Sequence, residues 1–194
     1  DAEAALQWLC TADVGVEIGR SVYTGMLNAR GTYESDVTVT RTAVDEYLIV
    51  SSAATTERDK DHIRTQIREH LPADANVNLV DVTSAYAVFG VMGPKSREVL
   101  SSLTSADLSD GAFPFGTSRL LSLGYATVRA TRITYVGQLG WELYVPAEFA
   151  VGLVYLLAYS VGLAVTLLLV AFLGQAFARR LGWLSRPTAN RVVG

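Results

Sequence analysis

The sequence of 194 residues has a single cysteine and no excess of basic residues. With Cys10 alone, neither a disulfide within the chain nor a cysteine metal cluster can form, and we interpret Cys10 as a small buried apolar residue in a helix. The chain has sixteen Lys and Arg and nineteen Asp and Glu, so the formal net charge is -3 and the pI is near 5.4. Nucleic-acid-binding domains usually carry a basic face, and this composition excludes that class of partner.

Several motifs are also missing. There is no G-x-G-x-x-G fingerprint, so nothing in this chain would hold a flavin or nicotinamide by itself. Residues 90–96, GVMGPKS, lack the spacing of a phosphate-binding loop. His62 and His70 lie on one predicted helix without a carboxylate at ligand spacing, so we expect no metal site. The chain starts at Asp1 without a signal or transit pattern, and we expect it to be a piece of a longer protein.

The order of predicted elements favours an α+β fold, with a mixed sheet and flanking helices. Apolar residues recur at helical spacing in some stretches and alternate with polar residues in others. In residues 33–40, for example, Val37 and Val39 fall on one face, while Asp36 and Thr38 fall on the other. We expect helices over residues 1–9 and 55–70, and strands over 21–27, 33–40, 47–51, 77–82, 85–91, 120–125 and 127–136.

The stretch over residues 134–146, TYVGQLGWELYVP, predicts a strand, a glycine turn and a second strand. Gly137 and Gly140 supply the backbone freedom for the turn. In the second strand the apolar residues at odd positions face the core, so Glu142 and Tyr144 are expected to point away from it. On this pattern alone, Glu142 is a solvated acid on an ordinary strand.

Three segments resemble one family. YVGQLGWELYVP, residues 135–146, is similar to Y-x-G-E-x-G-W-E-L-Y-x-P in the folate-binding domain of dimethylglycine and sarcosine dehydrogenases, and the glycine-cleavage T-protein carries a looser version. Residues 23–41, YTGMLNARGTYESDVTVTR, and residues 81–108, beginning DVTSAYAVFGVMGP, resemble two further segments in the same order. The resemblance implies the N-terminal part of the aminomethyltransferase folate-binding fold over residues 1–153, with residues 154–194 departing from it.

The resemblance also implies four site residues. Asp36 matches the family's aspartate, where a carboxylate stabilises a developing cation and orients the attacking folate nitrogen, so it is the expected catalytic residue. Thr38, on the same strand face, would support the site through its hydroxyl. Tyr135 would stack on the pterin or hydrogen-bond to it. Glu142 would accept hydrogen bonds from the ring N–H and the exocyclic amine of the pterin together.

The implied function is a tetrahydrofolate-binding module that accepts a one-carbon unit from a methylamine. FAD would belong only to a preceding domain absent from this chain. The pyruvate dehydrogenase phosphatase regulatory subunit shares the same architecture, so the alternative is a non-catalytic regulatory module with a protein partner. Gln138 and Thr32 depart from the family's pattern, and the family's S-L-R-x-E-K-G segment is missing, so we expect the chain alone to be inactive. The resemblance also implies a location in the mitochondrial matrix, or in the cytoplasm if the source is a bacterium.

The C-terminal stretch leaves three interpretations open. Residues 149–178 carry no charge and are long enough to cross a bilayer as a helix. Arg179, Arg180 and Arg186 follow, as after a membrane span. A genuine span would add membrane association. The other interpretations are a truncated or misread gene product, and a buried hairpin or oligomer-forming helix.

Overall fold

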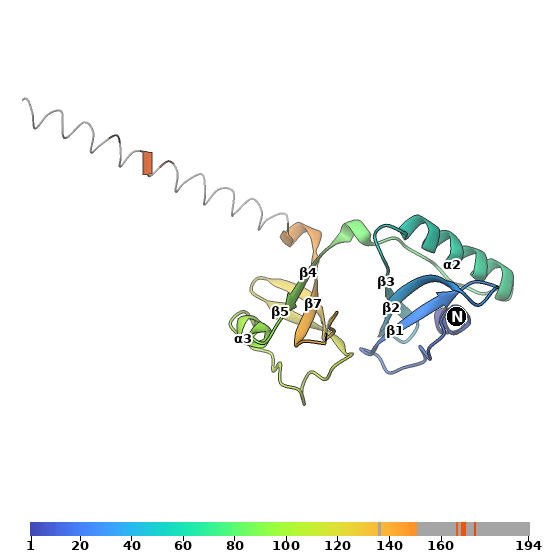
Figure 1. Ribbon diagram of the computed structural model, residues 1–194, viewed down its shortest axis with the longest axis horizontal. Helices are drawn as coiled ribbons and strands as arrows, with labels where there is room; N and C mark the ends of the chain where they lie inside the picture. The colour runs from blue at the N-terminus through green and yellow to red at the C-terminus, as the bar shows by residue number, and fades with distance from the viewer. Residues whose placement is uncertain (136, 151–165, 167, 170–172, 174–194) are drawn as a thin grey trace, which may run out of the picture. The chain divides into compact units, whose positions relative to one another are not determined.

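The computed structural model describes residues 1–135, 137–150, 166, 168, 169 and 173 (Figure 1). The chain divides into two compact units, Asp1–Ala147 and Glu148–Gly194. The first unit contains α1 (Ala2–Leu9), β1 (Ser21–Leu27), β2 (Tyr33–Ala43), β3 (Glu46–Val50), α2 (Thr56–His70), the 3-10 turn η1 (Thr83–Ala85), β4 (Tyr86–Met92), α3 (Ser96–Ser101), β5 (Ser118–Leu123), β6 (Ala126–Thr131) and β7 (Gly140–Pro146).

The predicted domain boundary after residue 153 and most of the predicted apolar helix lie outside the described residues. Within the described part of the chain, every helix is too short or too polar to cross a bilayer.

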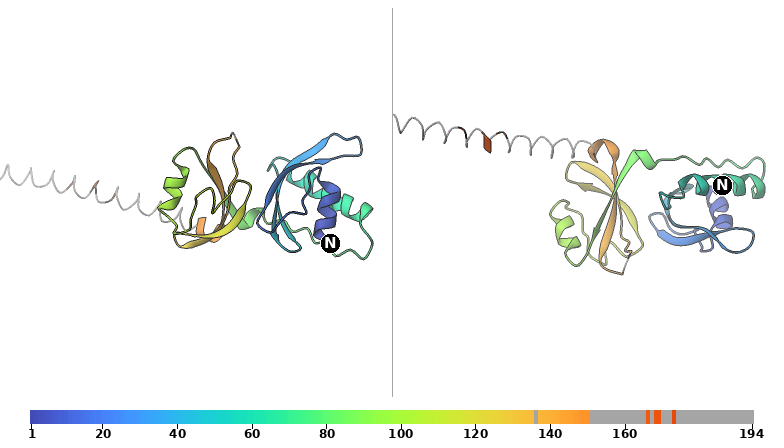
Figure 2. Two further views of the ribbon diagram at one scale, coloured as in Figure 1. Left: turned by 90° about the horizontal axis from the view of Figure 1, so that it is seen from below. Right: turned by 45° about the horizontal axis from the view of Figure 1, so that its top comes forward.

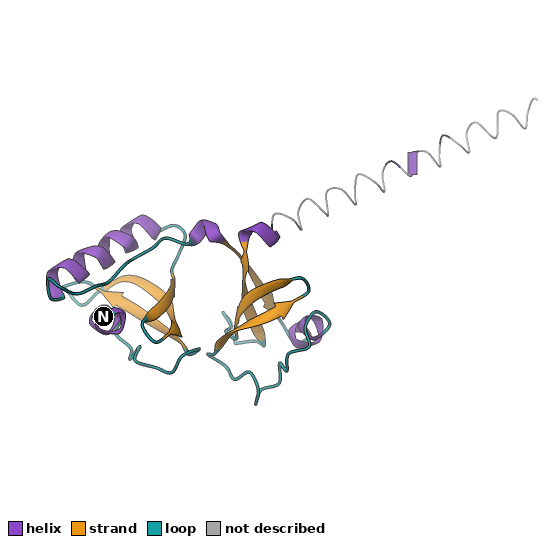
Figure 3. Cartoon of the chain, turned by 180° about the vertical axis from the view of Figure 1, so that it is seen from behind, coloured by secondary structure: helices purple, strands orange, loops and turns teal. Residues whose placement is uncertain are grey.

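The first sheet has the strand order β1-β2-β3, and both ladders are antiparallel. Alternation along β2 sends Val37 and Val39 inward, and each is only 1% exposed. Helices α1 and α2 pack on this inner face, leaving the other face of β2 free for polar residues (Figures 2 and 3). The buried apolar residues of this core are Leu6, Leu9, Cys10, Val14, Met26, Val37, Val39 and Ile63.

The second sheet has the order β4-β7-β6-β5, again antiparallel throughout. Its central strand β7 buries Trp141 completely, and the ring of Phe113 packs edge-on against it with 6.2 Å between ring centroids. The other members of this core are Leu100, Leu108, Leu121, Val128, Ala130 and Leu143.

These two sheets correct the predicted single mixed sheet. Every ladder is antiparallel, because the paired strands are joined by hairpins or, for β4 and β7, return from a long excursion in the opposite direction. The predicted strand over residues 77–82 is also wrong. Side chains fix that segment instead of a ladder: Leu79 packs against the first core, and Lys60 pairs with Asp81 at 2.8 Å.

The predicted strand over residues 127–136 is shorter than expected, because β6 ends at Thr131. The described residues between β6 and β7 form loop and turn. The stretch 134–146 therefore holds one strand, β7, and not the two that we predicted.

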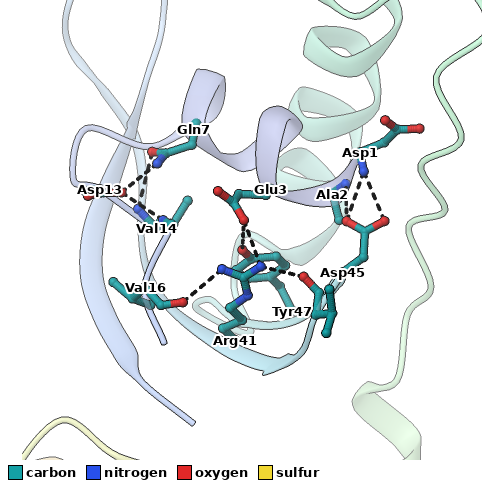
Figure 4. A network of polar contacts seen from close by, with 12 residues as sticks. Asp1, Ala2, Glu3, Gln7, Asp13, Val14, Val16, Arg41, Asp45 and Tyr47 are labelled. Atoms are coloured by element: carbon teal, nitrogen blue, oxygen red, sulfur yellow. Dashed lines mark hydrogen bonds and ion pairs between the residues drawn. The ribbon is translucent and has the colours of Figure 1, made fainter. Parts of the chain in front are cut away.

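A partly buried arginine, Arg41, ties α1 and the loop after it to β2 and to the turn before β3 (Figure 4). The guanidinium of Arg41 donates to the carbonyl oxygens of Val16 at 3.0 Å and Val44 at 2.6 Å. It also pairs with Glu3 at 2.8 Å and lies 5.5 Å from the centre of the Tyr47 ring. One planar group with several donors thereby holds three chain segments around the end of the first sheet.

Candidate functional site

The outer face of the β1-β2 hairpin displays the predicted catalytic residue. Asp36 is exposed on β2 and lies opposite Gly25 of β1, while Thr38 lies opposite Tyr23. The Tyr23 hydroxyl donates a hydrogen bond of 2.8 Å to Asp36 Oδ2. Asp36 and Thr38 share this face because residues two apart on a strand point the same way.

A pocket of about 440 Å³ opens beside the Asp36 carboxylate. Small-molecule sites in proteins typically measure about 300–1,000 Å³, so this volume fits a ligand of that class. Its lining combines two phenol rings, two acids, one arginine and three hydroxyl side chains: Tyr23, Tyr33, Glu34, Ser35, Asp36, Ser52, Thr55 and Arg58.

A buried carboxylate behind the pocket wall holds several of these lining residues. Asp59 on α2 is only 3% exposed. Its Oδ2 accepts hydrogen bonds from Ser35 Oγ at 2.9 Å and Thr55 Oγ1 at 2.8 Å. Its Oδ1 lies 3.7 Å from Arg58 Nε and is buried without a hydrogen bond. Asp59 thus links β2 to the start of α2 at the edge of the pocket.

Tyr135, another predicted site residue, lies in the loop after β6 and is 97% exposed. Tyr135 is outside the pocket lining. Within the pocket, the hydrogen bond to Asp36 is the largest cause that raises the pKa of the Tyr23 phenol, and burial and the Asp36 charge add to it.

Glu142 belongs to the second sheet, on the central strand β7. It is half-buried, and its Oε2 accepts a hydrogen bond of 2.6 Å from the Tyr144 hydroxyl. Tyr144 is only 4% exposed, so the expectation that this face of β7 points away from the core is wrong for Tyr144. Alternation alone shows which residues share a face, and it does not show whether that face is covered. The pKa of the Tyr144 phenol is raised mainly by burial, and the hydrogen bond to the Glu142 carboxylate raises it further.

The structure therefore groups the four predicted residues only in part. Asp36 lines the pocket, Thr38 follows it on the same face of β2, and Tyr135 is exposed in the loop after β6, outside the lining. In the described part of the chain, the pocket lining does not include Glu142. The functional roles of all four residues remain predictions.

Sequence reasoning missed Tyr23, Tyr33 and Asp59. A signal for Tyr23 was present, because pairing the predicted strands 21–27 and 33–40 as a hairpin places Tyr23 across from Thr38. Asp59 gave no such signal, since 24 residues separate it from Ser35. Among the described residues, no group of three or more His, Cys, Asp and Glu side chains is arranged to hold a metal ion.

Comparison with known proteins decides the family. The family model of the GCVT N-terminal domain matches residues 1–161. The chain belongs to this family. Human mitochondrial sarcosine dehydrogenase is 38% identical over 159 residues, which cover 75% of this chain and 17% of that protein. The formaldehyde-forming 4-methylaminobutanoate oxidase of Paenarthrobacter nicotinovorans is 37% identical over 151 residues, covering 78% and 18%.

A mitochondrial regulatory subunit is similar as well. The mouse pyruvate dehydrogenase phosphatase regulatory subunit is 34% identical over 151 residues, covering 77% of this chain and 17% of that protein. This GCVT-family chain thus spans about a sixth of the length of these curated relatives. The predicted membership of this family is confirmed.

Two solved structures share the fold. Glycine cleavage system aminomethyltransferase T from Bartonella henselae aligns with a TM-score of 0.63 at 21% identity, covering 78% of this chain and 39% of that one. Heterotetrameric sarcosine oxidase from Corynebacterium sp. U-96 aligns with a TM-score of 0.55 at 19% identity, covering 77% and 67%. The likeness confirms an α+β fold similar to that of an aminomethyltransferase.

Proposed function

We propose that this GCVT domain binds tetrahydrofolate and receives a one-carbon unit from a methylamine at the pocket beside Asp36. The observation that carries the proposal is the position of Asp36: the aspartate of the family motif lies on the rim of a ligand-sized pocket, with a tyrosine hydroxyl bonded to it. Relatives named as aminomethyltransferase and as sarcosine and dimethylglycine dehydrogenases support the substrate class.

The residues present suit a reduced folate. Tetrahydrofolate would supply a nucleophilic ring nitrogen that takes up the one-carbon unit. Asp36 would stabilise positive charge on the incoming unit, and the Tyr23 hydroxyl, which donates to one oxygen, would fix the carboxylate in place. Thr38 and Tyr135 would contribute a hydroxyl and a ring beside it. Glu142 lies outside the pocket lining, so its proposed role toward the pterin N–H groups rests on the family resemblance alone.

Equilibrium titration of the full chain with tetrahydrofolate tests this proposal. We expect saturable binding that weakens at least tenfold in Asp36→Asn and in Glu142→Gln, since a hydrogen bond to a charged group contributes about 1.5–3 kcal/mol. Asp61→Asn, an exposed acid on α2, is the matched control and should bind as the original chain does. Equal affinity in all four proteins would refute the roles of Asp36 and Glu142.

A regulatory module is the second candidate, and the 34% identity to the pyruvate dehydrogenase phosphatase regulatory subunit favours it. In that case the domain would bind a protein partner and would not catalyse a reaction. Absence of tetrahydrofolate binding, in a chain whose cooperative unfolding shows that it is folded, would support this candidate over the first. Several relatives carry "mitochondrial" in their names, and we propose the mitochondrial matrix, or the cytoplasm in a bacterium, as the location.

A further inference from the structure

Strand β4 forms one edge of the second sheet and exposes apolar side chains there. Tyr86 is 40% exposed, Val88 54% and Phe89 44%. The strand, YAVFGVM, contains no charged residue and no proline, and its pairing with β7 runs without a bulge. Proteins usually protect an exposed edge strand with charges, proline or a bulge, because its unpaired backbone groups pair readily with another chain. β4 has none of these protections.

The other edge strands of the two sheets differ from β4. On the open side of β1, the Thr11 N–H donates to the Gly25 carbonyl oxygen at 3.0 Å, so another segment covers that edge. β3 is only five residues long and begins with the exposed Glu46. β5 carries the charged Arg119. Of the four sheet edges in the described part of the chain, β4 is the one that is both uncharged and open.

The hydrogen-bond pattern shows which backbone groups of β4 are free. Just beyond the last pair of the β4–β7 ladder, the Gly93 N–H donates to the Leu139 carbonyl oxygen at 2.7 Å. Bonded and non-bonded pairs alternate along an antiparallel ladder, so the odd-numbered residues of β4 bond to β7. The even-numbered residues therefore direct their N–H and C=O groups to the open edge. Val88 and Gly90, both exposed, lie in the middle of this row.

We propose that β4 of one copy pairs with β4 of a second copy, antiparallel and centred on Phe89. In this register Phe89 lies opposite Phe89 of the second copy, Val88 lies opposite Gly90, and all seven residues of the strand are paired. Even-numbered residues then meet even-numbered residues, as the free N–H and C=O groups require. The central Phe89 pair is a non-hydrogen-bonded one, in which the two side chains approach most closely.

The sequence of β4 favours a second copy as the partner. A strand without charge meets an identical strand without repulsion, and like charges directly opposite each other would destabilise the pair. Two phenylalanine rings at the centre form an aromatic cross-strand pair, which stabilises antiparallel strands. The contact uses the same surface on both copies, so a two-fold axis closes it as a dimer with one continuous sheet.

Sedimentation equilibrium of the full chain tests the pairing. We expect the average mass to rise from 20.9 kDa towards twice that value as the protein concentration increases. Val88→Lys should weaken the association at least about tenfold, because charges on an edge strand oppose pairing. Leu120→Lys is the matched control. Leu120 is 60% exposed in the same cross-strand row but on the opposite edge strand, β5, so the association should not change.

Oxidative cross-linking tests the register and does not depend on the lysine variants. Phe89→Cys should give a covalent dimer, because directly opposite Cβ atoms lie about 4.5–5.5 Å apart, close to the span of a disulfide. Val88→Cys should not, because the two copies of residue 88 would be diagonal neighbours, about 7–8 Å apart. The native Cys10 is buried and does not compete. Cooperative urea unfolding of each variant verifies that it is folded.

Three results would overturn the proposal. A monomer at every concentration would show that β4 does not pair with a second copy. An association that is unchanged in Val88→Lys would show that the copies meet through another surface. Equal cross-linking of Phe89→Cys and Val88→Cys would refute the register. The pairing uses no residue of the pocket beside Asp36, so it stands or falls independently of tetrahydrofolate binding.

Discussion

Replacing Asp59 with alanine should destabilise the first unit. The loss comes from hydrogen bonds to its buried carboxylate and not from apolar packing. Its carboxylate accepts bonds from Ser35 on β2 and from Thr55 at the start of α2. Thr55 can turn to its second acceptor, the carbonyl oxygen of Ser52 at 3.2 Å. Ser35 has only a marginal alternative at 3.5 Å, the carbonyl oxygen of Asp36.

The magnitude follows from these partners. Leaving the buried Ser35 hydroxyl without a good acceptor costs about 1–3 kcal/mol. Asp59 also lies in the first turn of α2, where an acid stabilises the helix dipole by about 0.3–1 kcal/mol. We expect Asp59→Ala to lower the free energy of unfolding by about 1.3–4 kcal/mol in total. Asp59→Asn keeps an acceptor of the same shape and should lose less.

Urea unfolding of the full chain, with linear extrapolation to water, measures this difference. Asp61→Ala is the control on the same helix, exposed and expected to change the free energy of unfolding by less than about 0.5 kcal/mol. The double variant Ser35→Ala/Asp59→Ala should be more stable than the sum of the single effects predicts, because the first change removes the donor that the second leaves unpaired. Additive effects, or a stable Asp59→Ala, would refute the reasoning.

Three further predictions concern Tyr144, Cys10 and Arg41. The pKa of the Tyr144 phenol is higher in the folded chain than in the unfolded chain, so its contribution to stability is complete below about pH 10 and is lost as the pH rises further. Glu142→Gln should lower the pKa of Tyr144 in the folded chain. An absorbance titration measures this, with Tyr144→Phe as the reference that lacks the phenol. Burial raises the pKa of Cys10 to about 11, so a thiol reagent at about pH 8 should modify it slowly in the folded chain and rapidly in urea. Arg41→Ala should lower the free energy of unfolding by about 2–4 kcal/mol, because two backbone carbonyls lose a charged donor.

Each of these has a result that would contradict it. Tyr144 ionising near pH 10 in the folded chain would show that it is not sealed from water. Equal modification rates of Cys10 with and without urea would show that the first core does not shield the thiol from the reagent. Arg41→Lys should recover less than half of the loss, since an ammonium cannot bridge both carbonyls, and full recovery would mean that charge alone matters. Arg30→Ala, an exposed arginine in the turn before β2, is the control.

The sequence was sufficient for most strands and for which way their side chains point. Along β2 the alternation correctly separated Val37 and Val39 from Asp36 and Thr38, because the direction of a side chain on a strand depends only on its neighbours in the chain. Thr40, expected on the same polar face, is instead only 2% exposed. The same reasoning failed at residues 77–82, where branched residues favour a strand but no ladder forms. It also failed for Tyr144, because alternation does not show whether the second face of β7 is covered.

By itself, then, the sequence determined the family, the faces of the strands and the position of Asp36 on one of them. Only the tertiary structure decided the surroundings of that carboxylate: Tyr23 bonded to it from β1, the Tyr33 ring resting on Gly25, and Asp59 behind the wall. The physical reason is the range of the interactions. Periodicity records local geometry, whereas the pocket depends on strand register and on the docking of α2, which join residues far apart in the chain.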